Sequence, residues 1–337
     1  MTTTNDSEGI VASKANFLRG RTTTAFWMTV VLIALVALFS IFTPNHSFFQ
    51  VSNFQSMGRD AAIGILLAVG MTYVLGAGHL DLSVGANLVL SSVLGAKAMA
   101  AFATSTNFVT DLLIGLVVCF VVGALIGVIN GLLVTRARVN SFITTLATTG
   151  IAAGVTLVIA GGADVPGVPQ GVQLNFGVVN VFGIPITILV IAPCVIVLWI
   201  VLLRTRFGIR TVAIGSDTES AIRAGINVKR HVFSIFILSG VLAGVAGLLD
   251  ITRFGSTNIL GHSTDSLAAI AAVVIGGTSL FGGRASIGGS LAGALIPVVL
   301  GTGLVIAGLP FYYQQAVVGV ILLVAVYLDQ RRRERTI

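Results

Sequence analysis

Long apolar runs separated by short polar connections dominate this chain of 337 residues. Hydrophobic residues make up 55% of the sequence and charged residues only 9%, whereas charged residues supply about a quarter of an ordinary soluble domain. A helix needs about 20 apolar residues to cross a bilayer. We therefore predict an all-α polytopic membrane protein with about ten transmembrane helices, in which the 40 glycines provide broken helices and glycine-rich turns. The expected spans are residues 25–42, 61–76, 84–103, 109–134, 142–161, 184–203, 232–251, 267–281, 287–307 and 311–328.

Basic residues are distributed unevenly around these runs. Of the 19 lysines and arginines, all except Arg59, Lys97 and Arg253 fall on the side that ten spans assign to the cytoplasm. Cytoplasmic loops carry an excess of Lys and Arg, so this distribution favours ten spans over nine or eleven and places both termini in the cytoplasm. The net charge of +7 follows from this topology and indicates no nucleic-acid partner. The expected parts are a flexible cytoplasmic tail (1–24), a transmembrane domain (25–328) and a basic cytoplasmic tail (329–337).

Residues 204–230 form the longest polar stretch between two spans. Ser216 and Glu219 have the S-x-x-E spacing of a capping box, in which each side chain caps the backbone N–H of the other residue. This spacing predicts a helix that begins after Ser216 and stops at Gly225, which suits the left-handed conformation that ends a helix. A helix of about two turns is too short to be stable alone in water, so we expect it to dock against another part of the protein or against another chain.

This polar stretch also resembles the cytoplasmic coupling loop of permease subunits from sugar-importing ABC transporters of the ribose, xylose and arabinose type. The family pattern is T-x-F-G-x-x-x-x-A-I-G-x-N-x-x-A-A-x-x-x-G-I. The chain departs from it at Asp217, where the family usually has Asn, and at Ser220, where it has the first Ala of the pair. The resemblance implies that the loop contacts an ATPase. The residues expected to couple to the ATPase are Thr205, Phe207, Gly208, Gly215, Ser216, Glu219, Ala221, Arg223, Gly225 and Ile226.

Further motifs extend the resemblance over most of residues 70–293. The HLDLSVG run at 79–85 is similar to the family's I-D-L-S-V-G, with Leu80 in place of Ile. The AAIAAVVIGGTSLFGG run that begins at Ala268 matches closely. The chain nevertheless lacks both acids of the family's E-L-D-A-I-A-A run, with Asp265 one position earlier, and it has Thr302 in place of the Asn of N-G-L. These departures leave the identity of the solute open.

Asp81 lies between two spans, where a carboxylate is costly unless it is paired or capped. Two interpretations are open: Asp81 or Ser83 caps the N-terminus of the third span, or Asp81 gates or lines the solute pathway. His79 is expected at an interface and not in a metal site, because no second His or Cys stands at ligand spacing. The candidate pathway or gate residues are Asp81, Ser83, Asn87, Asn130, Thr144 and Thr278.

The sequence contains no nucleophile motif and no phosphate-binding loop, so we expect a non-catalytic subunit. The resemblance implies a multi-pass permease of the bacterial cytoplasmic (inner) membrane, with no cofactor of its own. It also implies three kinds of partner: a second permease chain, identical or different; a nucleotide-binding ATPase that holds ATP and Mg²⁺; and a periplasmic or lipoprotein solute-binding protein.

The spans also constrain the solute. A carboxylate or phosphate in a low-dielectric pathway would need an Arg or Lys near mid-membrane, yet Lys97 is the basic residue expected well inside a span, toward its outer end. A neutral monosaccharide or sugar-like polyol therefore fits best. Two alternatives are a branched-chain amino-acid-type ABC permease and a secondary transporter without an ATPase. The second alternative predicts ionisable residues at mid-membrane, of which the apolar runs are almost free.

Overall fold

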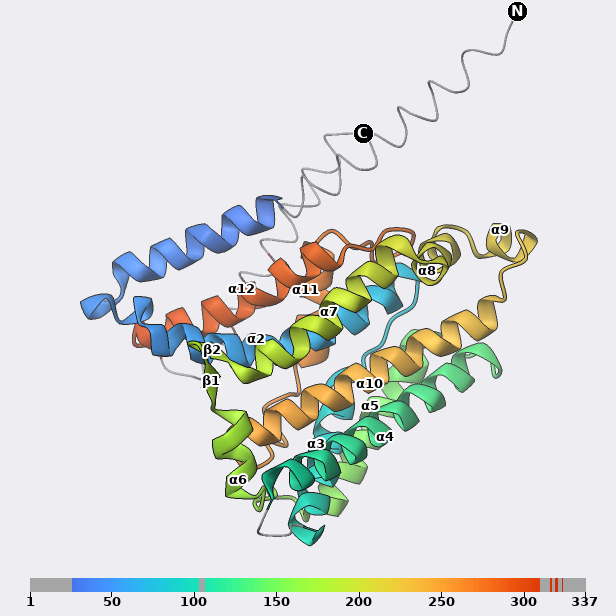
Figure 1. Ribbon diagram of the computed structural model, residues 1–337. Coiled ribbons are helices and arrows are strands. Elements are labelled where there is room, and N and C mark those ends of the chain that lie inside the picture. The colour runs from blue at the N-terminus through green and yellow to red at the C-terminus, as the bar shows by residue number, and fades with distance from the viewer. Residues whose placement is uncertain (1–25, 103–106, 310–315, 317–318, 321–322, 324–337) are drawn as a thin grey trace, which may run out of the picture.

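The computed structural model describes residues 26–102, 107–309, 316, 319–320 and 323, which form a bundle of helices (Figure 1). Among the described residues, seven helices are long and apolar enough to cross a membrane. They are α2 (Val51–Gly76), α3 (Val84–Phe102), α4 (Phe108–Thr135), α5 (Ser141–Ala160), α7 (Ile186–Arg204), α10 (Val228–Phe254) and α12 (Ile287–Ile306). Two shorter apolar helices, Phe26–Phe42 and α11 (Asp265–Ile275), accompany them. The predicted all-α polytopic architecture is confirmed.

Most expected spans coincide with a helix to within a few residues, and two differ. α2 begins at Val51 and not at residue 61, because the polar residues that precede its apolar part continue the same helix. α11 ends at Ile275, short of the predicted end at residue 281, because two glycines follow and Gly277 has a φ of 94°. The expected tenth span at 311–328 and both tails lie outside the continuously described residues.

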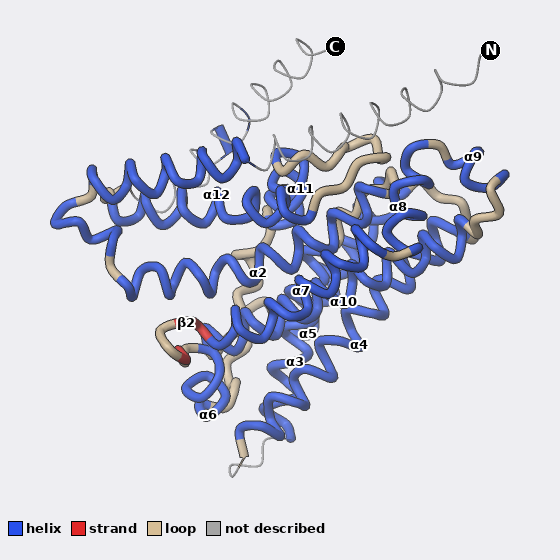
Figure 2. The backbone as a smooth tube through the Cα atoms, turned by 45° about the horizontal axis from the view of Figure 1, so that its top comes forward, coloured by secondary structure: helices blue, strands red, loops and turns tan. Residues whose placement is uncertain are grey.

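Short elements connect the long helices. η1 (Pro44–Phe49) precedes α2, while α6 (Gln170–Val172), η2 (Gln173–Gly177) and the antiparallel strands β1 (Asn180–Val181) and β2 (Ile184–Pro185) lie between α5 and α7. Figure 2 shows helices throughout, with strands of the described residues confined to this hairpin. Arg59 of α2 holds the region in place, since its Nη2 donates to the carbonyl oxygen of Val178 and to Oδ1 of Asn180, both at 2.7 Å.

Glycines allow α4 and α10 to cross in backbone contact. A Cβ atom on Gly123 would lie 2.4 Å from the carbonyl oxygen of Gly240, and one on Gly244 would lie 2.2 Å from that of Cys119. Small residues at such spacing are typical of helix pairs in lipid, where close approach maximises van der Waals contact. Asn87 of α3 lies over this crossing, because its Nδ2 donates to the carbonyl oxygens of Gly123 (3.4 Å) and Gly240 (3.2 Å).

The first turns of α3 and α11 meet in the buried interior. Ser266 Oγ accepts a hydrogen bond from the N–H of Gly85 at 3.0 Å and donates to the carbonyl oxygen of Leu82 at 2.7 Å. A hydroxyl group on α11 therefore satisfies a first-turn N–H group of α3 that has no partner within its own helix. Because the positive ends of both helix dipoles lie together here, the arrangement favours negative charge nearby. The cavity described next lies beside this junction.

Candidate functional site

A cavity of about 280 Å³ lies between α2, α10, α11, α12 and the connection 255–264. Such a volume is near the lower end of the roughly 300–1,000 Å³ typical of small-molecule pockets, so it suits one small solute. A second cavity of about 330 Å³ shares Asp60, Pro297 and Val298 with it and extends along α12 past Thr302. The polar side chains that line the first cavity are Asp60, Asp250, Asn258, His262 and Asp265. Its apolar side chains are Ile63, Leu67, Phe254, Ala268, Ala269, Ala272, Ala294, Pro297 and Val298.

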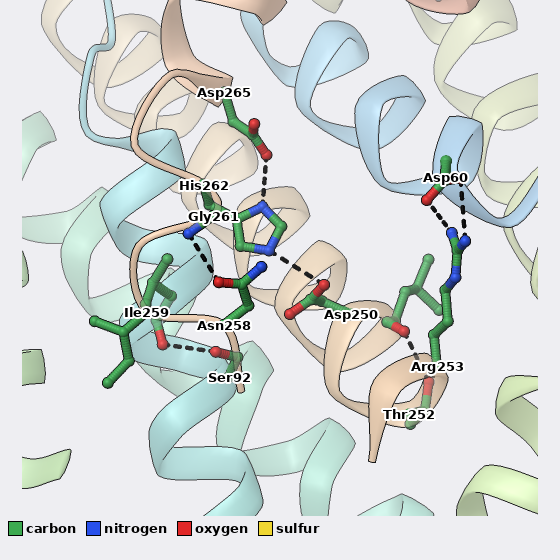
Figure 3. A network of polar contacts seen from close by, with 12 residues as sticks. Asp60, Ser92, Asp250, Thr252, Arg253, Asn258, Ile259, Gly261, His262 and Asp265 are labelled. Carbon is green, nitrogen blue, oxygen red and sulfur yellow. Dashed lines mark hydrogen bonds and ion pairs between the residues drawn. The ribbon is translucent and has the colours of Figure 1, made fainter. Parts of the chain in front are cut away.

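At one edge of this cavity, Asp60 of α2 pairs with Arg253 of α10 (Figure 3). The contact is bidentate: both guanidinium Nη atoms donate to the carboxylate, Nη2 to Oδ2 at 3.0 Å. The Arg253 side chain is 16% exposed and that of Asp60 is 40% exposed, so the pair is partly shielded from solvent. Bidentate Arg–carboxylate pairs are among the stronger charge-assisted contacts in proteins. The pair fixes α2 to the end of α10.

On the other side, His262 lies between two carboxylates (Figure 3). Its Nδ1 is 2.7 Å from Oδ2 of Asp265, and its Nε2 is 3.1 Å from Oδ1 of Asp250. Burial by itself lowers the pKa of His262, but hydrogen bonding and charge from Asp250 and Asp265 outweigh it and raise the pKa from 6.5 to about 10. At neutral pH the imidazole is therefore a cation held by two anions.

Asp250 has an unusual environment for a charged group. Its side chain is only 1% exposed and lies on α10, whose hydropathy suits a membrane span. His262 Nε2 faces Oδ1 of Asp250 at 3.1 Å with poor hydrogen-bond alignment, and Oδ2 of Asp250 has no hydrogen-bond donor among the described residues. A buried acceptor without a donor costs about 1–3 kcal/mol, and more when it is charged. The cavity beside Asp250 is where a donor could be supplied.

Asp81, the predicted gate or cap, lies in a different buried network. Its Oδ1 accepts from the backbone N–H (3.0 Å) and the hydroxyl (2.6 Å) of Ser83, and its Oδ2 accepts from Ser239 Oγ of α10 at 2.9 Å. Burial raises the pKa of Asp81, although these hydrogen bonds oppose the shift. Ser83 Oγ in turn accepts from Asn130 Nδ2 of α4 at 2.8 Å, and Thr148 Oγ1 of α5 donates to Asn130 Oδ1 at 2.8 Å. The network joins the start of α3 to three other helices.

The predicted pathway residues are thus mainly interhelical contacts. Asp81 and Asn130 are buried and neither lines the cavity. Thr144 is buried as well, and its hydroxyl has no hydrogen-bond partner among the described residues. Thr278 lies in the turn after α11, where its Oγ1 accepts from the N–H of Ser286 at 3.1 Å. Asp81 accepts from the N–H of Ser83, directly before α3, and not from a first-turn N–H group of α3, so both interpretations of Asp81 stay predictions.

The polar stretch 204–230 contains two helices, α8 (Arg206–Ser216) and α9 (Thr218–Arg223), where one was predicted. The predicted Ser216 cap is wrong by one residue: Asp217 is the N-cap of α9, and its Oδ1 accepts from the N–H of Glu219 (3.0 Å) and of Ser220 (3.3 Å). Asp caps helices as well as Ser does, and Ser216 Oγ already donates to the carbonyl oxygen of Val212 within α8. Glu219 caps nothing in return and pairs with Arg223 at 3.2 Å. The predicted left-handed stop at Gly225 is confirmed by its φ of 80°.

Several of the expected coupling residues hold α8 to the bundle. A Cβ on Gly215 would lie 2.1 Å from the carbonyl oxygen of Gly76, and one on Gly208 would lie 2.0 Å from that of Leu202. Phe207 packs against His231 with ring centroids 4.5 Å apart. Thr205 Oγ1, just before α8, donates to the carbonyl oxygen of Val201 at 2.7 Å. A displacement of α8 would therefore reach the ends of α2, α7 and α10 directly.

α9 has one side on the protein and one side free. Ala221 is 3% exposed, whereas its neighbour Ile222 is 57% exposed. The ion pair between Glu219 and Arg223 lies on the exposed surface. Ala221 therefore packs α9 onto its own chain, as Ile226 does in part, and the surface open to a partner carries Ile222, Glu219 and Arg223.

Residues 54–326 match the model of a family described as "Branched-chain amino acid transport system / permease component". The chain belongs to this family of permease components. It is 39% identical over 303 residues to the ribose import permease protein of Bacillus subtilis, covering 89% of this chain and 91% of the relative. It is 35% identical over 300 residues to the D-allose transport system permease protein of Escherichia coli, covering 89% of this chain and 90% of the relative. It is 32% identical over 328 residues to the L-arabinose transport system permease protein of Escherichia coli, covering 97% of each. No solved structure matches.

Sequence reasoning missed the cavity of this permease. Arg253 was predicted only to lie away from the cytoplasmic side, and His262 was not among the predicted site residues. The available signal was Asp250, an acid inside an apolar run, since an ionisable residue in a span is a functional hypothesis by default. Its partner could not be read from the sequence, because the connection 255–264 brings His262 back onto α10 only in three dimensions.

Proposed function

We propose that this chain is the transmembrane permease subunit of an ATP-driven ABC importer for a monosaccharide or sugar-like polyol in the bacterial cytoplasmic membrane. The observation that carries the proposal is its similarity, over about nine-tenths or more of its length, to permeases named for ribose, D-allose and L-arabinose. The chain would form the translocation pathway and hydrolyse nothing itself. ATP and Mg²⁺ would bind to a partner ATPase.

The cavity supports a sugar over an amino acid. Three carboxylates, those of Asp60, Asp250 and Asp265, stand against two cations, Arg253 and His262, and both cations are already paired. An amino acid is a zwitterion: its ammonium group could bind a carboxylate here, but its own carboxylate would enter a net negative site without a free cation among the cavity's described residues. A sugar brings hydroxyl groups that can donate to carboxylates, and C–H surfaces that can pack on the alanines, Leu67 and Pro297.

The coupling segment supports the partner assignment. α9 is short, exposed on one side, and attached through α8 to the ends of the long helices. An ATPase that binds Ile222 and its neighbours would displace α8, and α8 would tilt α2, α7 and α10, which it contacts. Tilting of helix bundles against each other is how transporters of this type alternate access between the two sides of the membrane. A second permease chain and an external solute-binding protein complete the proposed assembly.

Copurification and uptake test the proposal. A tagged chain isolated from its native membranes should bring with it an ATPase, and cells that carry the whole system should take up a monosaccharide or polyol in preference to branched-chain amino acids. Recovery of the chain alone, active in liposomes on an ion gradient, would favour a secondary transporter. Preferred uptake of branched-chain amino acids would refute the assignment of a sugar as the solute but would agree with the assignment of the chain as a permease.

A further inference from the structure

The carboxylate of Asp250 is the best candidate in the cavity for a direct solute contact. It lines the cavity, its side chain is 1% exposed, and, while Oδ1 faces His262 Nε2 at 3.1 Å, Oδ2 has no hydrogen-bond donor among the described residues. The other charged groups are already engaged: Asp60 is held by Arg253, and Asp265 takes the short 2.7 Å contact from His262 Nδ1. Asp250 therefore retains more free accepting capacity than the other lining carboxylates.

The unpaired oxygen of Asp250 determines which kind of solute group can bind to it. A carboxylate is an acceptor only, so its complement is an O–H or N–H donor. His262 Nε2 lies 3.1 Å from Oδ1 of Asp250, and Oδ2 has no hydrogen-bond partner among the described residues. Small apolar residues, such as Ala268 and Ala272 on α11, line the cavity as well. A monosaccharide has both surfaces that this environment needs, hydroxyl donors on its edges and C–H groups on its faces.

We propose that Asp250 is a solute-contacting and specificity-determining residue of the translocation pathway, whose carboxylate accepts hydrogen bonds from hydroxyl groups of the passing sugar. The inference rests on the proposed function. It assigns Asp250 a role that differs from that of Asp81, both of whose oxygens already accept hydrogen bonds, from Ser83 and Ser239. His262 holds one side of the Asp250 carboxylate and leaves the other side to the solute.

A cycle that combines a residue change with a substrate change tests this contact. The complete transporter, with its ATPase and binding protein, is reconstituted in proteoliposomes, and ATP-dependent uptake of the transported sugar is compared with that of each of its monodeoxy analogues. D250N keeps the volume of the side chain and removes its charge. In the wild type, the analogue lacking the contacted hydroxyl should be transported about tenfold more slowly than the parent sugar, as for loss of one hydrogen bond to a charged group. In D250N this penalty should shrink to about threefold for that analogue, because Asn still accepts the hydroxyl but without the charge, while the other analogues keep their wild-type penalties.

The quantity compared is the uptake rate of the analogue divided by that of the parent sugar, in D250N and in the wild type. The same binding protein delivers both solutes to both transporters, so any preference of the binding protein cancels and a difference between the two quotients comes from the permease. D164N is the matched control: Asp164 is exposed, lies outside the cavity, and accepts the N–H of Ile259 at 2.8 Å, a bond that Asn can also accept. D164N should retain the wild-type pattern of penalties. A D250N transporter that slows all analogues by one common factor, or none, would overturn the proposal. A wild-type transporter that moves no sugar at all would instead refute the proposed function.

A second variant covers the case in which D250N does not assemble. A268C, in a chain whose Cys119 and Cys194 are replaced by alanine, adds a thiol to the cavity wall without changing the charged cluster. Saturating sugar-loaded binding protein should slow alkylation of this thiol several-fold relative to unloaded binding protein. An unchanged alkylation rate, in a complex that transports the sugar, would show that the solute does not pass the wall facing Asp250 and would contradict the proposal.

Discussion

Replacing His262 by glutamine should destabilise the folded permease strongly. The Asp250 side chain is 1% exposed, and the imidazole at 3.1 Å is the cation that compensates it. Removing one partner of a buried ion pair costs about 3–5 kcal/mol, because the other charge is left buried and alone. At about 2 °C per kcal/mol for a large chain, the midpoint of thermal unfolding should fall by about 6–10 °C.

The double variant D250N/H262Q identifies the cause. It removes both charges and leaves two amides of similar size, so it should recover most of the stability lost by H262Q alone. The interaction energy of the cycle should exceed about 2 kcal/mol, as for residues in direct contact. D265N serves as a control, and its loss of stability should be smaller than that of H262Q. The Asp265 side chain is 28% exposed, so water can replace part of its contact with His262.

The assay is thermal unfolding of the purified permease in one detergent, followed by loss of the monodisperse peak and by tryptophan fluorescence. If H262Q unfolds at the wild-type temperature, His262 does not compensate the buried Asp250 and the prediction is wrong. The prediction is also wrong if the double variant is no more stable than H262Q, since Asp250 and His262 would then contribute independently to stability.

Three further predictions concern other parts of the chain. The pKa of His262 is about 10 in the folded protein and 6.5 ordinarily, so the stability that its charge contributes is fully present below pH 6.5 and is lost as the pH rises through 10. The unfolding temperature of the wild type should therefore fall between pH 6.5 and 10, and that of D250N/H262Q should fall much less. Gly240→Leu should prevent correct assembly, because a Cβ there would lie 2.3 Å from the carbonyl oxygen of Gly123, whereas Gly150→Ala, with no atom within 4 Å, should express and purify normally. Ile222→Asp should leave the permease folded and inserted but abolish copurification of the ATPase; an undiminished ATPase yield would show that α9 is not the docking surface.

The apolar runs were sufficient to locate most helices. The bounds of α4, α5 and α12 follow from length and hydropathy, because a membrane span must satisfy all of its backbone hydrogen bonds within one long helix. The polar start of α2 was missed because hydropathy does not distinguish a polar helix from a polar loop. Only in the fold does Arg59 contact the hairpin that stabilises this end of the helix.

The site was harder to predict than the fold, because its residues are distant in sequence. Asp60 and Arg253 are 193 residues apart and meet only when α2 packs on α10. In the coupling stretch, the existence and the end of the short helix were predictable from Gly225, but its start was not, since Ser216 and Asp217 are both good caps and the preceding helix α8 decides between them. Asp81 was predicted either to cap α3 or to gate the pathway; its contacts with Ser83 and Ser239 lie in the packing between helices, and it does not line the cavity.

Reconstitution of the permease with its copurified ATPase and binding protein in sealed proteoliposomes tests the central claim most directly. Uptake of labelled monosaccharides, polyols and branched-chain amino acids is measured with and without ATP on the side of α9. The account predicts ATP-dependent accumulation of a monosaccharide or polyol that requires the binding protein and persists when ion gradients are collapsed. Accumulation of a branched-chain amino acid in its place, or sugar uptake that follows an ion gradient and ignores ATP, would contradict it.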